Sequence, residues 1–105
     1  MLTINIAKDY TKTPGGRFIA EGEYSGEAFR KKWLRPKYLE ARETNQNLQV
    51  ILDGGYGYAT SFLEEAFGGL ARELKDRKIL DIEFVSEEEP ALIEKIQRYI
   101  QDALV

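Results

Sequence analysis

The sequence contains no cysteine and no histidine among its 105 residues. Without cysteine the chain has neither a disulfide framework nor a thiol nucleophile, and a cytoplasmic setting is the expectation. Without histidine it has no serine–histidine relay, no histidine ligand for zinc, and no side chain whose ordinary pKa lies near neutrality. We therefore expect a protein that is not an enzyme and has no catalytic residues, metal or cofactor.

Long apolar runs are also missing. None approaches the ~20 residues that a membrane span requires, and the start MLTINIAKDY lacks the basic residues and the long apolar centre of a signal peptide. Hydrophobic residues make up 43% of the chain and charged residues 31%, values that are typical of a soluble globular protein. The length predicts one domain, residues 1–105, with a single core.

The net charge of −3 conceals an uneven distribution. Residues 1–47 carry nine Lys or Arg against six acids, whereas residues 48–105 carry six against twelve. The basic surplus lies mainly in RKKWLRPK, residues 30–37, and an acidic run lies in SEEEP, residues 86–90. Such a dipolar chain favours a protein partner over nucleic acid.

Nucleic-acid binding through residues 30–37 is an alternative in which Trp33 would stack on a base. Trp33 shares a helical face with Phe29, however, which favours a place for Trp33 in the core.

Strand-like and helix-like patterns alternate along the chain. Apolar or alternating patterns predict strands over 2–6, 47–53 and 79–85. Helices are expected over 26–39, 61–75 and 90–104. Ser25 is the expected N-cap of the first helix, and Pro36 is expected to kink or restart it. In the last helix Pro90 fits the first turn, and a core stripe is expected from Leu92, Ile96, Tyr99 and Ala103.

The segment between the first strand and the first helix, residues 8–26, contains several glycines and is expected to be a loop, with a brief strand through Phe18 and Ile19.

Strands that alternate with helices predict βαβ crossovers and a mostly parallel sheet. Polar residues line one face of the first and third strands, whereas a doubly wound sheet would bury both faces. We therefore expect a small α/β layer with helices mainly on one side.

The stretch DGGYGYATSFLEEAFGGLARE, residues 53–73, joins the central strand to the second helix. Ser61 and Glu64 have the spacing of a capping box, which predicts Ser61 as the N-cap. Helical periodicity then predicts a core stripe of Phe62, Leu63, Ala66, Phe67, Leu70, Ala71 and Leu74.

Two glycines interrupt this helix, each at a cost of up to ~1 kcal/mol relative to alanine. At about 100° per residue, Gly68 falls opposite the stripe in line with Glu64 and Arg72, and Gly69 falls on its flank. Close packing would compensate for Gly69. The outward Gly68 is either a tolerated surface position or part of a bare helix face on which a partner docks.

The turn before the helix also permits two interpretations. Asp53 ends the central strand at the edge where open α/β sheets place binding crevices, and the 53–61 turn could hold a small ligand, an anion or a phosphate. The turn matches neither G-x-G-x-x-G nor a P-loop, which favours a purely structural turn. Gly15, Gly16 and Arg17 in TPGGR form a second candidate for anion binding.

Phosphate chemistry at Asp53, as in a receiver domain, is a further alternative. Receivers carry an acidic pair after the first strand and a lysine after a late strand. The chain offers only Asp9 after its first strand, and no strand follows the last helix, so this alternative is disfavoured.

The blocks VILDGGYGYATSFLEEAFGGLAR, TPGGRF and SGEAFR resemble the STAS-like domains of unknown function, bacterial relatives of the STAS domain (sulfate transporter and anti-sigma factor antagonist). The resemblance implies a non-enzymatic regulatory domain that binds another protein in signalling. STAS antagonists bind a kinase-like ATPase near the start of this helix, where a hydroxyl residue is the phosphorylation switch. STAS-like members often accompany histidine-kinase-type ATPases.

By position, the switch would be Ser61 or Thr60. The line Ala59-Thr60-Ser61-Phe62 lacks the Asp before the hydroxyl and the Gly after it that mark the antagonists, which favours the capping role for Ser61. The expected partner surface comprises Tyr56, Tyr58, Thr60, Ser61, Glu64, Gly68 and Arg72. A homodimer formed through the one-sided sheet or its edge stays open.

Overall fold

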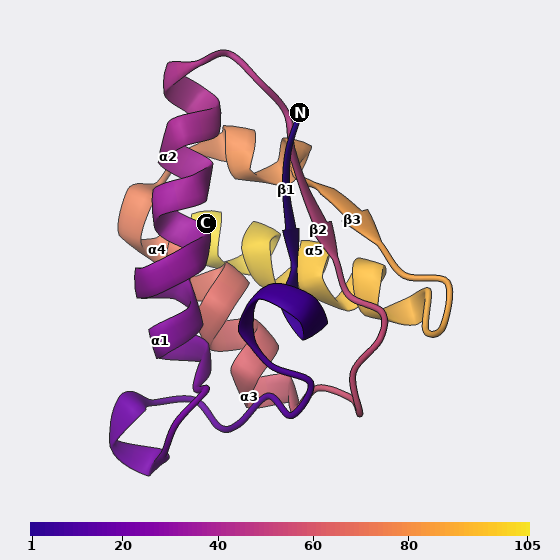
Figure 1. The fold of residues 1–105 in the computed structure, drawn as a ribbon. Coiled ribbons are helices and arrows are strands. Elements are labelled where there is room, and N and C mark those ends of the chain that lie inside the picture. Colours follow the sequence, from indigo (N-terminus) through magenta and orange to yellow (C-terminus); the bar gives the residue numbers. More distant parts are fainter.

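A three-stranded sheet organises the protein in the computed structural model, which describes residues 1–105. The strands β1 (Leu2–Asn5), β2 (Leu48–Ile51) and β3 (Glu83–Val85) lie in the order β1-β2-β3, and both pairs are parallel (Figure 1). The predicted parallel α/β fold is confirmed.

Only one face of the sheet is covered. Ile4, Val50 and Phe84 are in register across the three strands and are buried. On the opposite face Thr3 donates to Gln49 (3.4 Å) and Gln49 donates to Glu83 (3.2 Å). The alternation of burial along the strands confirms that the helices cover mainly one side.

Several predicted boundaries are wrong because side chains cap short turns. After β1 the chain forms a π-helical turn, Ile6–Tyr10, where a loop was expected, because Asn5 accepts from the Lys8 amide (3.1 Å). The predicted strand at 18–19 is a 3-10 turn, Ile19–Glu21, in which the Glu21 carboxylate accepts from the Phe18 amide (2.8 Å).

The third predicted strand likewise begins too early. Residues Arg77–Asp81 form a 3-10 turn because the Asp76 carboxylate accepts from the Lys78 amide (3.0 Å). Extended pairing starts only at Glu83.

The first long helical segment combines α1 (Gly26–Phe29), a π-helical turn (Arg30–Leu34) and α2 (Arg35–Glu43). The Ser25 hydroxyl accepts from the Ala28 amide (3.0 Å), so the predicted N-cap is confirmed. Pro36 lies in the first turn of α2, as expected of a restarted helix. Pro36 has no backbone N–H, so it donates no hydrogen bond to the π-helical turn that precedes α2.

The second segment combines α3 (Thr60–Leu63), a π-helical turn (Glu64–Gly68) and α4 (Gly69–Leu74), and it ends at Lys75 in a left-handed conformation. The predicted stripe lies in the core, with only Leu74 partly exposed. The Phe67 ring meets the Phe84 ring edge to face, with centroids 5.2 Å apart.

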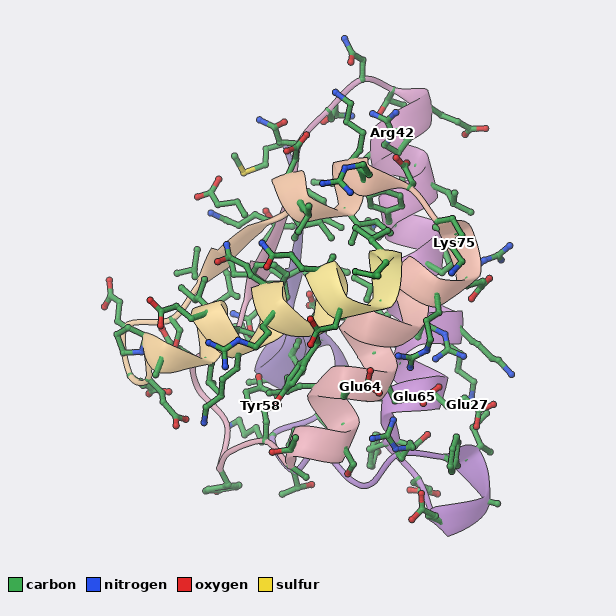
Figure 2. All side chains as sticks on the ribbon, turned by 180° about the vertical axis from the view of Figure 1, so that it is seen from behind. Glu27, Arg42, Tyr58, Glu64, Glu65 and Lys75 are labelled. Atoms are coloured by element: carbon green, nitrogen blue, oxygen red, sulfur yellow. The ribbon has the colours of Figure 1, made fainter.

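The last helix, α5 (Ala91–Leu104), packs against the Glu64–Gly68 turn and α4 (Figure 2). Leu92, Ile96 and Ile100 are buried, whereas Tyr99 and Ala103 of the predicted stripe are only partly buried. No helix in the structure has the length and apolar character needed to cross a membrane.

Candidate interaction surface at the carboxyl ends of the strands

Three loops meet beyond the carboxyl ends of the parallel strands. They are residues 11–24, 53–59 and 86–89. In Figure 1 the first loop follows the helical turn after β1, and the other two follow the arrowheads of β2 and β3. The middle loop contacts both of the others: the Tyr56 amide donates to the Lys12 carbonyl (2.9 Å), and Asp53 binds residues 86–88. The surface that these loops form is called the carboxyl-end surface below.

Asp53 joins two of these loops. Its carboxylate accepts from the Glu87 amide (2.7 Å), the Glu88 amide (3.1 Å) and the Ser86 hydroxyl (3.2 Å). In return, the Glu88 carboxylate accepts from the Gly54 amide (2.9 Å). The Glu87 amide is the main cause that lowers the pKa of Asp53. With both carboxylate oxygens occupied, Asp53 is a poor phosphoacceptor, which disfavours receiver-like chemistry.

Backbone geometry explains the glycines of the 53–59 turn. Gly54 and Gly57 have φ values of 98° and 121°, and a Cβ at Gly55 would lie 3.0 Å from the Lys12 carbonyl. The Tyr58 hydroxyl donates to the Leu52 carbonyl (2.7 Å), and burial raises its pKa. Tyr58 therefore holds the turn in place, whereas Tyr56 points into solvent with 84% of its surface exposed.

Tyr56 is not alone in its exposure. The large hydrophobic residues Phe18, Ile19 and Tyr24 of the 11–24 loop are exposed as well. Ile19 and Tyr24 line a groove against α1, and Tyr24 has a positive φ of 59°. Sequence reasoning missed these three residues. The signal was three large apolar side chains between Pro14 and Ser25, in a segment too rich in glycine to form a core element.

The predicted capping box at the start of the second helix is wrong. Ala59 is the N-cap, and its side chain makes no cap hydrogen bond. The helix begins at Thr60, which places Ser61 inside the first turn. Glu64 does not turn back toward the N-cap because two guanidinium groups attract its carboxylate, Arg17 at 2.6 Å and Arg72 at 2.5 Å.

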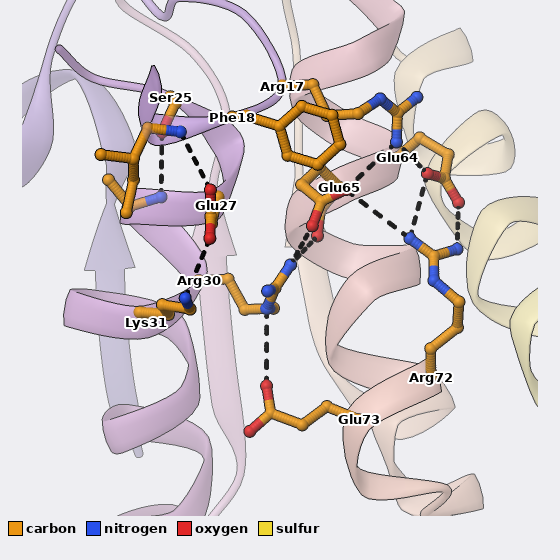
Figure 3. A network of polar contacts seen from close by, with 12 residues as sticks. Arg17, Phe18, Ser25, Glu27, Arg30, Lys31, Glu64, Glu65, Arg72 and Glu73 are labelled. Atoms are coloured by element: carbon orange, nitrogen blue, oxygen red, sulfur yellow. Dashed lines mark hydrogen bonds and ion pairs between the residues drawn. The ribbon is translucent and has the colours of Figure 1, made fainter. Parts of the chain in front are cut away.

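These contacts belong to an ionic network between the 11–24 loop and the two long helical segments (Figure 3). Glu65 is only 9% exposed and pairs with Arg30 (2.5 Å) and Arg17 (3.2 Å). Arg72, and then Arg17, lower the pKa of Glu64 through hydrogen bonds. The network fastens the 11–24 loop to the protein.

The structure disfavours the second candidate for anion binding, at Gly15, Gly16 and Arg17. The charge of Arg17 is directed at Glu64 and Glu65. Two carbonyls of this loop bind the start of the first helix: Gly16 accepts from the Gly26 amide (2.9 Å), and Arg17 accepts from the Glu27 amide (3.0 Å). The carboxylates of Glu64 and Glu65 beside Arg17 would repel an anion.

The prediction of an outward-facing Gly68 is also wrong, because Gly68 is buried. The π-helical turn changes the angular spacing that placed it opposite the stripe, and α5 packs against the same turn. A Cβ at Gly68 would lie 2.6 Å from a carboxylate oxygen of Glu64, which pairs with Arg72 across this position. Gly69 is closely packed, as expected: its Cβ would contact the Arg30 guanidinium.

The basic run 30–37 is largely neutralised. Arg30, Lys31, Arg35 and Lys37 each lie within ion-pair distance of a glutamate, and only Lys32 does not. Trp33 is partly buried, with its ring 6.5 Å from that of Tyr10. This arrangement disfavours nucleic-acid binding through the run.

The residues expected to bind a partner therefore separate into two groups. Tyr56 is exposed on the carboxyl-end surface, Thr60 is exposed beside it, and Ser61 is partly exposed. The other four have structural roles in the turn and the network: Tyr58, Glu64, Gly68 and Arg72. The structure moves the candidate site from the helix face to the loops.

Comparison with known proteins agrees with the fold. The family model of the STAS-like domain of unknown function (DUF4325) matches residues 25–90, from the N-cap of α1 to the start of α5. Searches of curated proteins and of solved structures found no match. Since the family model covers well over half of the chain, the protein belongs to the family of STAS-like domains of unknown function.

Proposed function

We propose that this protein is a non-enzymatic regulatory domain that binds another protein through the carboxyl-end surface. The observation that carries the proposal is the exposure of four large side chains on these loops: Phe18, Ile19, Tyr24 and Tyr56. Exposed apolar side chains that gather, as three of these do on the 11–24 loop, mark interaction sites, and aromatic residues are enriched in protein interfaces. Membership of the STAS-like family supports a regulatory, protein-binding role.

The directions of the pKa shifts support a role without catalysis. Burial raises the pKa of Tyr10 to about 12 and also raises that of Tyr38. Hydrogen bonds lower the pKa of the carboxyl groups of Glu27, Asp53, Glu64 and Asp76. Each shift moves the group away from neutral pH, whereas a general acid or base works best with a pKa near the working pH.

The partner in this proposal is a histidine-kinase-type ATPase, and the setting is cytoplasmic. Membership of the STAS-like family, whose members often accompany such ATPases, supports this choice, and Thr60 is exposed at the start of α3. No side chain caps that helix start, so a phosphate on Thr60 or Ser61 would meet the positive end of the helix. Phosphorylation there would add negative charge at the helix start that follows the 53–59 turn.

A capture experiment tests the proposed function. The wild-type domain and an Ile19→Ser/Tyr56→Ser variant are immobilised, exposed to lysate of the native host and analysed by quantitative mass spectrometry. We expect an ATPase captured by the wild type to be lost with the variant, because two exposed anchors are removed. A Leu39→Ser/Val105→Ser variant, which changes exposed apolar residues elsewhere, is the matched control. Equal capture by all three proteins would contradict the proposal.

A further inference from the structure

The carboxyl-end surface combines its apolar side chains with a strong surplus of negative charge. Its three loops contain six carboxylates: Glu21, Glu23, Asp53, Glu87, Glu88 and Glu89. Against these stand two cations, Lys12 and Arg17, and the charge of Arg17 is directed at Glu64 and Glu65. None of the six carboxylates takes part in an ion pair within the protein.

A hollow lies within this surface, between the 53–59 turn and the start of α5. Its lining residues include Leu52, Tyr56, Tyr58, Glu88, Glu89 and Leu92. Leu52 and Leu92 are buried and form an apolar floor, while Tyr56 and Glu89 are exposed. No lysine or arginine lines the hollow.

The carboxylates differ in how far the fold uses them. Glu88 accepts from the Gly54 amide, whereas the side chains of Glu87 and Glu89 accept no hydrogen bond. Acidic residues favour the N-terminus of a helix such as α5, which accounts for some of this charge. It does not account for an apolar hollow or for a tyrosine exposed over 84% of its surface beside that charge.

Resting on the proposed function, we propose that the carboxyl-end surface binds a basic and apolar segment of its partner protein, with an arginine or lysine seated in the hollow beside Tyr56. The aliphatic part of such a side chain packs on Leu52 and Leu92, and its cation meets the ring of Tyr56 and the carboxylate of Glu89. Charge complementarity excludes unsuitable partners and speeds association. A second copy of this chain docked through the same surface brings the same negative charge to the contact, which opposes self-association there.

The test uses 12-residue peptides displayed on phage and selected on the immobilised wild-type domain. We expect the enriched peptides to contain Arg or Lys next to apolar residues. Their affinity for a Glu87→Lys/Glu89→Lys variant is expected to fall by about tenfold or more, and higher salt is expected to weaken the wild-type complex. A Glu43→Lys/Asp102→Lys variant changes the net charge equally at exposed sites elsewhere and is expected to bind as the wild type does.

Enrichment of peptides without basic residues, equal binding by the charge-reversed variant, or no enrichment at all would each overturn the inference. Sedimentation of the free domain as a dimer that Tyr56→Ser dissociates would also overturn it, because the occupant would then be a second copy. The capture experiment separates this inference from the proposed function. If the Ile19→Ser/Tyr56→Ser variant loses a partner that Glu87→Lys/Glu89→Lys retains, the surface binds a protein but does not select it by charge.

Discussion

At the scale of single residues, most of the conspicuous polar groups stabilise the fold. Glu65 is buried between Arg30 and Arg17, and Asp53 binds the amides of the β3–α5 loop. A buried charge that loses its partner costs far more than an exposed one, because the remaining charge stays out of water. Glu65 therefore supports the surface from outside it, and Asp53 holds two of its loops together.

Replacing Glu65 tests this distinction. Glu65→Ala leaves the Arg30 guanidinium, whose side chain is 11% exposed, without its closest carboxylate. We expect the free energy of unfolding in urea to fall by about 3 kcal/mol. Glu40→Ala, which removes an exposed pair with Lys37, is the control and is expected to cost no more than about 0.5 kcal/mol. Equal losses of unfolding free energy in the two variants would show that the pair of Glu65 and Arg30 behaves like an exposed ion pair.

The lowered pKa of Asp53 predicts a dependence of stability on pH. A carboxyl group with a lowered folded pKa adds stability above its unfolded pKa, and that stability disappears as the pH falls through the folded value. The ordinary pKa of this group is 3.8, so the loss is expected below that pH.

Asp53→Asn is therefore expected to lower the Tm at pH 7. The difference in Tm from the wild type is expected to shrink as the pH falls below 3.8, because the wild-type carboxyl group then becomes protonated as well. Thermal unfolding followed by circular dichroism measures both proteins across this range. A difference in Tm that stays constant into acid would contradict the role of the charge.

At the scale of elements, the two long helical segments cross where the first begins. A Cβ at Gly26 would lie 2.5 Å from the Phe62 carbonyl and 3.1 Å from the Phe62 Cα, so backbone meets backbone at this point. The Phe29 and Phe62 rings pack beside the crossing with centroids 5.8 Å apart. The crossing sets where α3 begins relative to the 53–59 turn.

Gly26→Ala is expected to destabilise the protein by about 1–3 kcal/mol, because neither backbone can yield without shifting its helix. Gly16→Ala is the matched control in the neighbouring loop, where the nearest atom would be a Glu21 carboxylate oxygen at 3.5 Å. Urea unfolding of both variants measures the difference. A neutral Gly26→Ala would mean that the crossing is looser than the structure shows.

Sequence patterns predicted the strands, the long helices and the one-sided sheet because apolar periodicity reports burial directly. They placed Gly68 wrongly because a regular helix was assumed where the chain forms a π-helical turn at Glu64–Gly68. The capping box failed for a different reason: arginines distant in sequence attract Glu64. Long-range partners of this kind are invisible to a pattern that spans a few residues.

At the scale of the whole molecule, parallel strands bring three loops from distant parts of the chain to one side. The sequence placed Asp53 and the 53–61 turn at this edge correctly. It did not bring Phe18, Ile19 and Tyr24 to the same surface. The path of the 11–24 loop depends on long-range contacts that Lys12 makes with the 53–59 turn and that Arg17 makes with the two long helical segments. The opposite face of the sheet is uncovered, and a homodimer through it stays a prediction that sedimentation of the free protein tests.

The central claim is that the carboxyl-end surface binds the partner. Hydrogen–deuterium exchange of the domain, alone and in complex with the captured partner, tests it most directly. We predict that binding slows exchange in residues 11–24, 53–59 and 86–89 and leaves α2 unchanged. Protection confined to α2, or to the strands behind the open face of the sheet, with the three loops unaffected, would contradict the account.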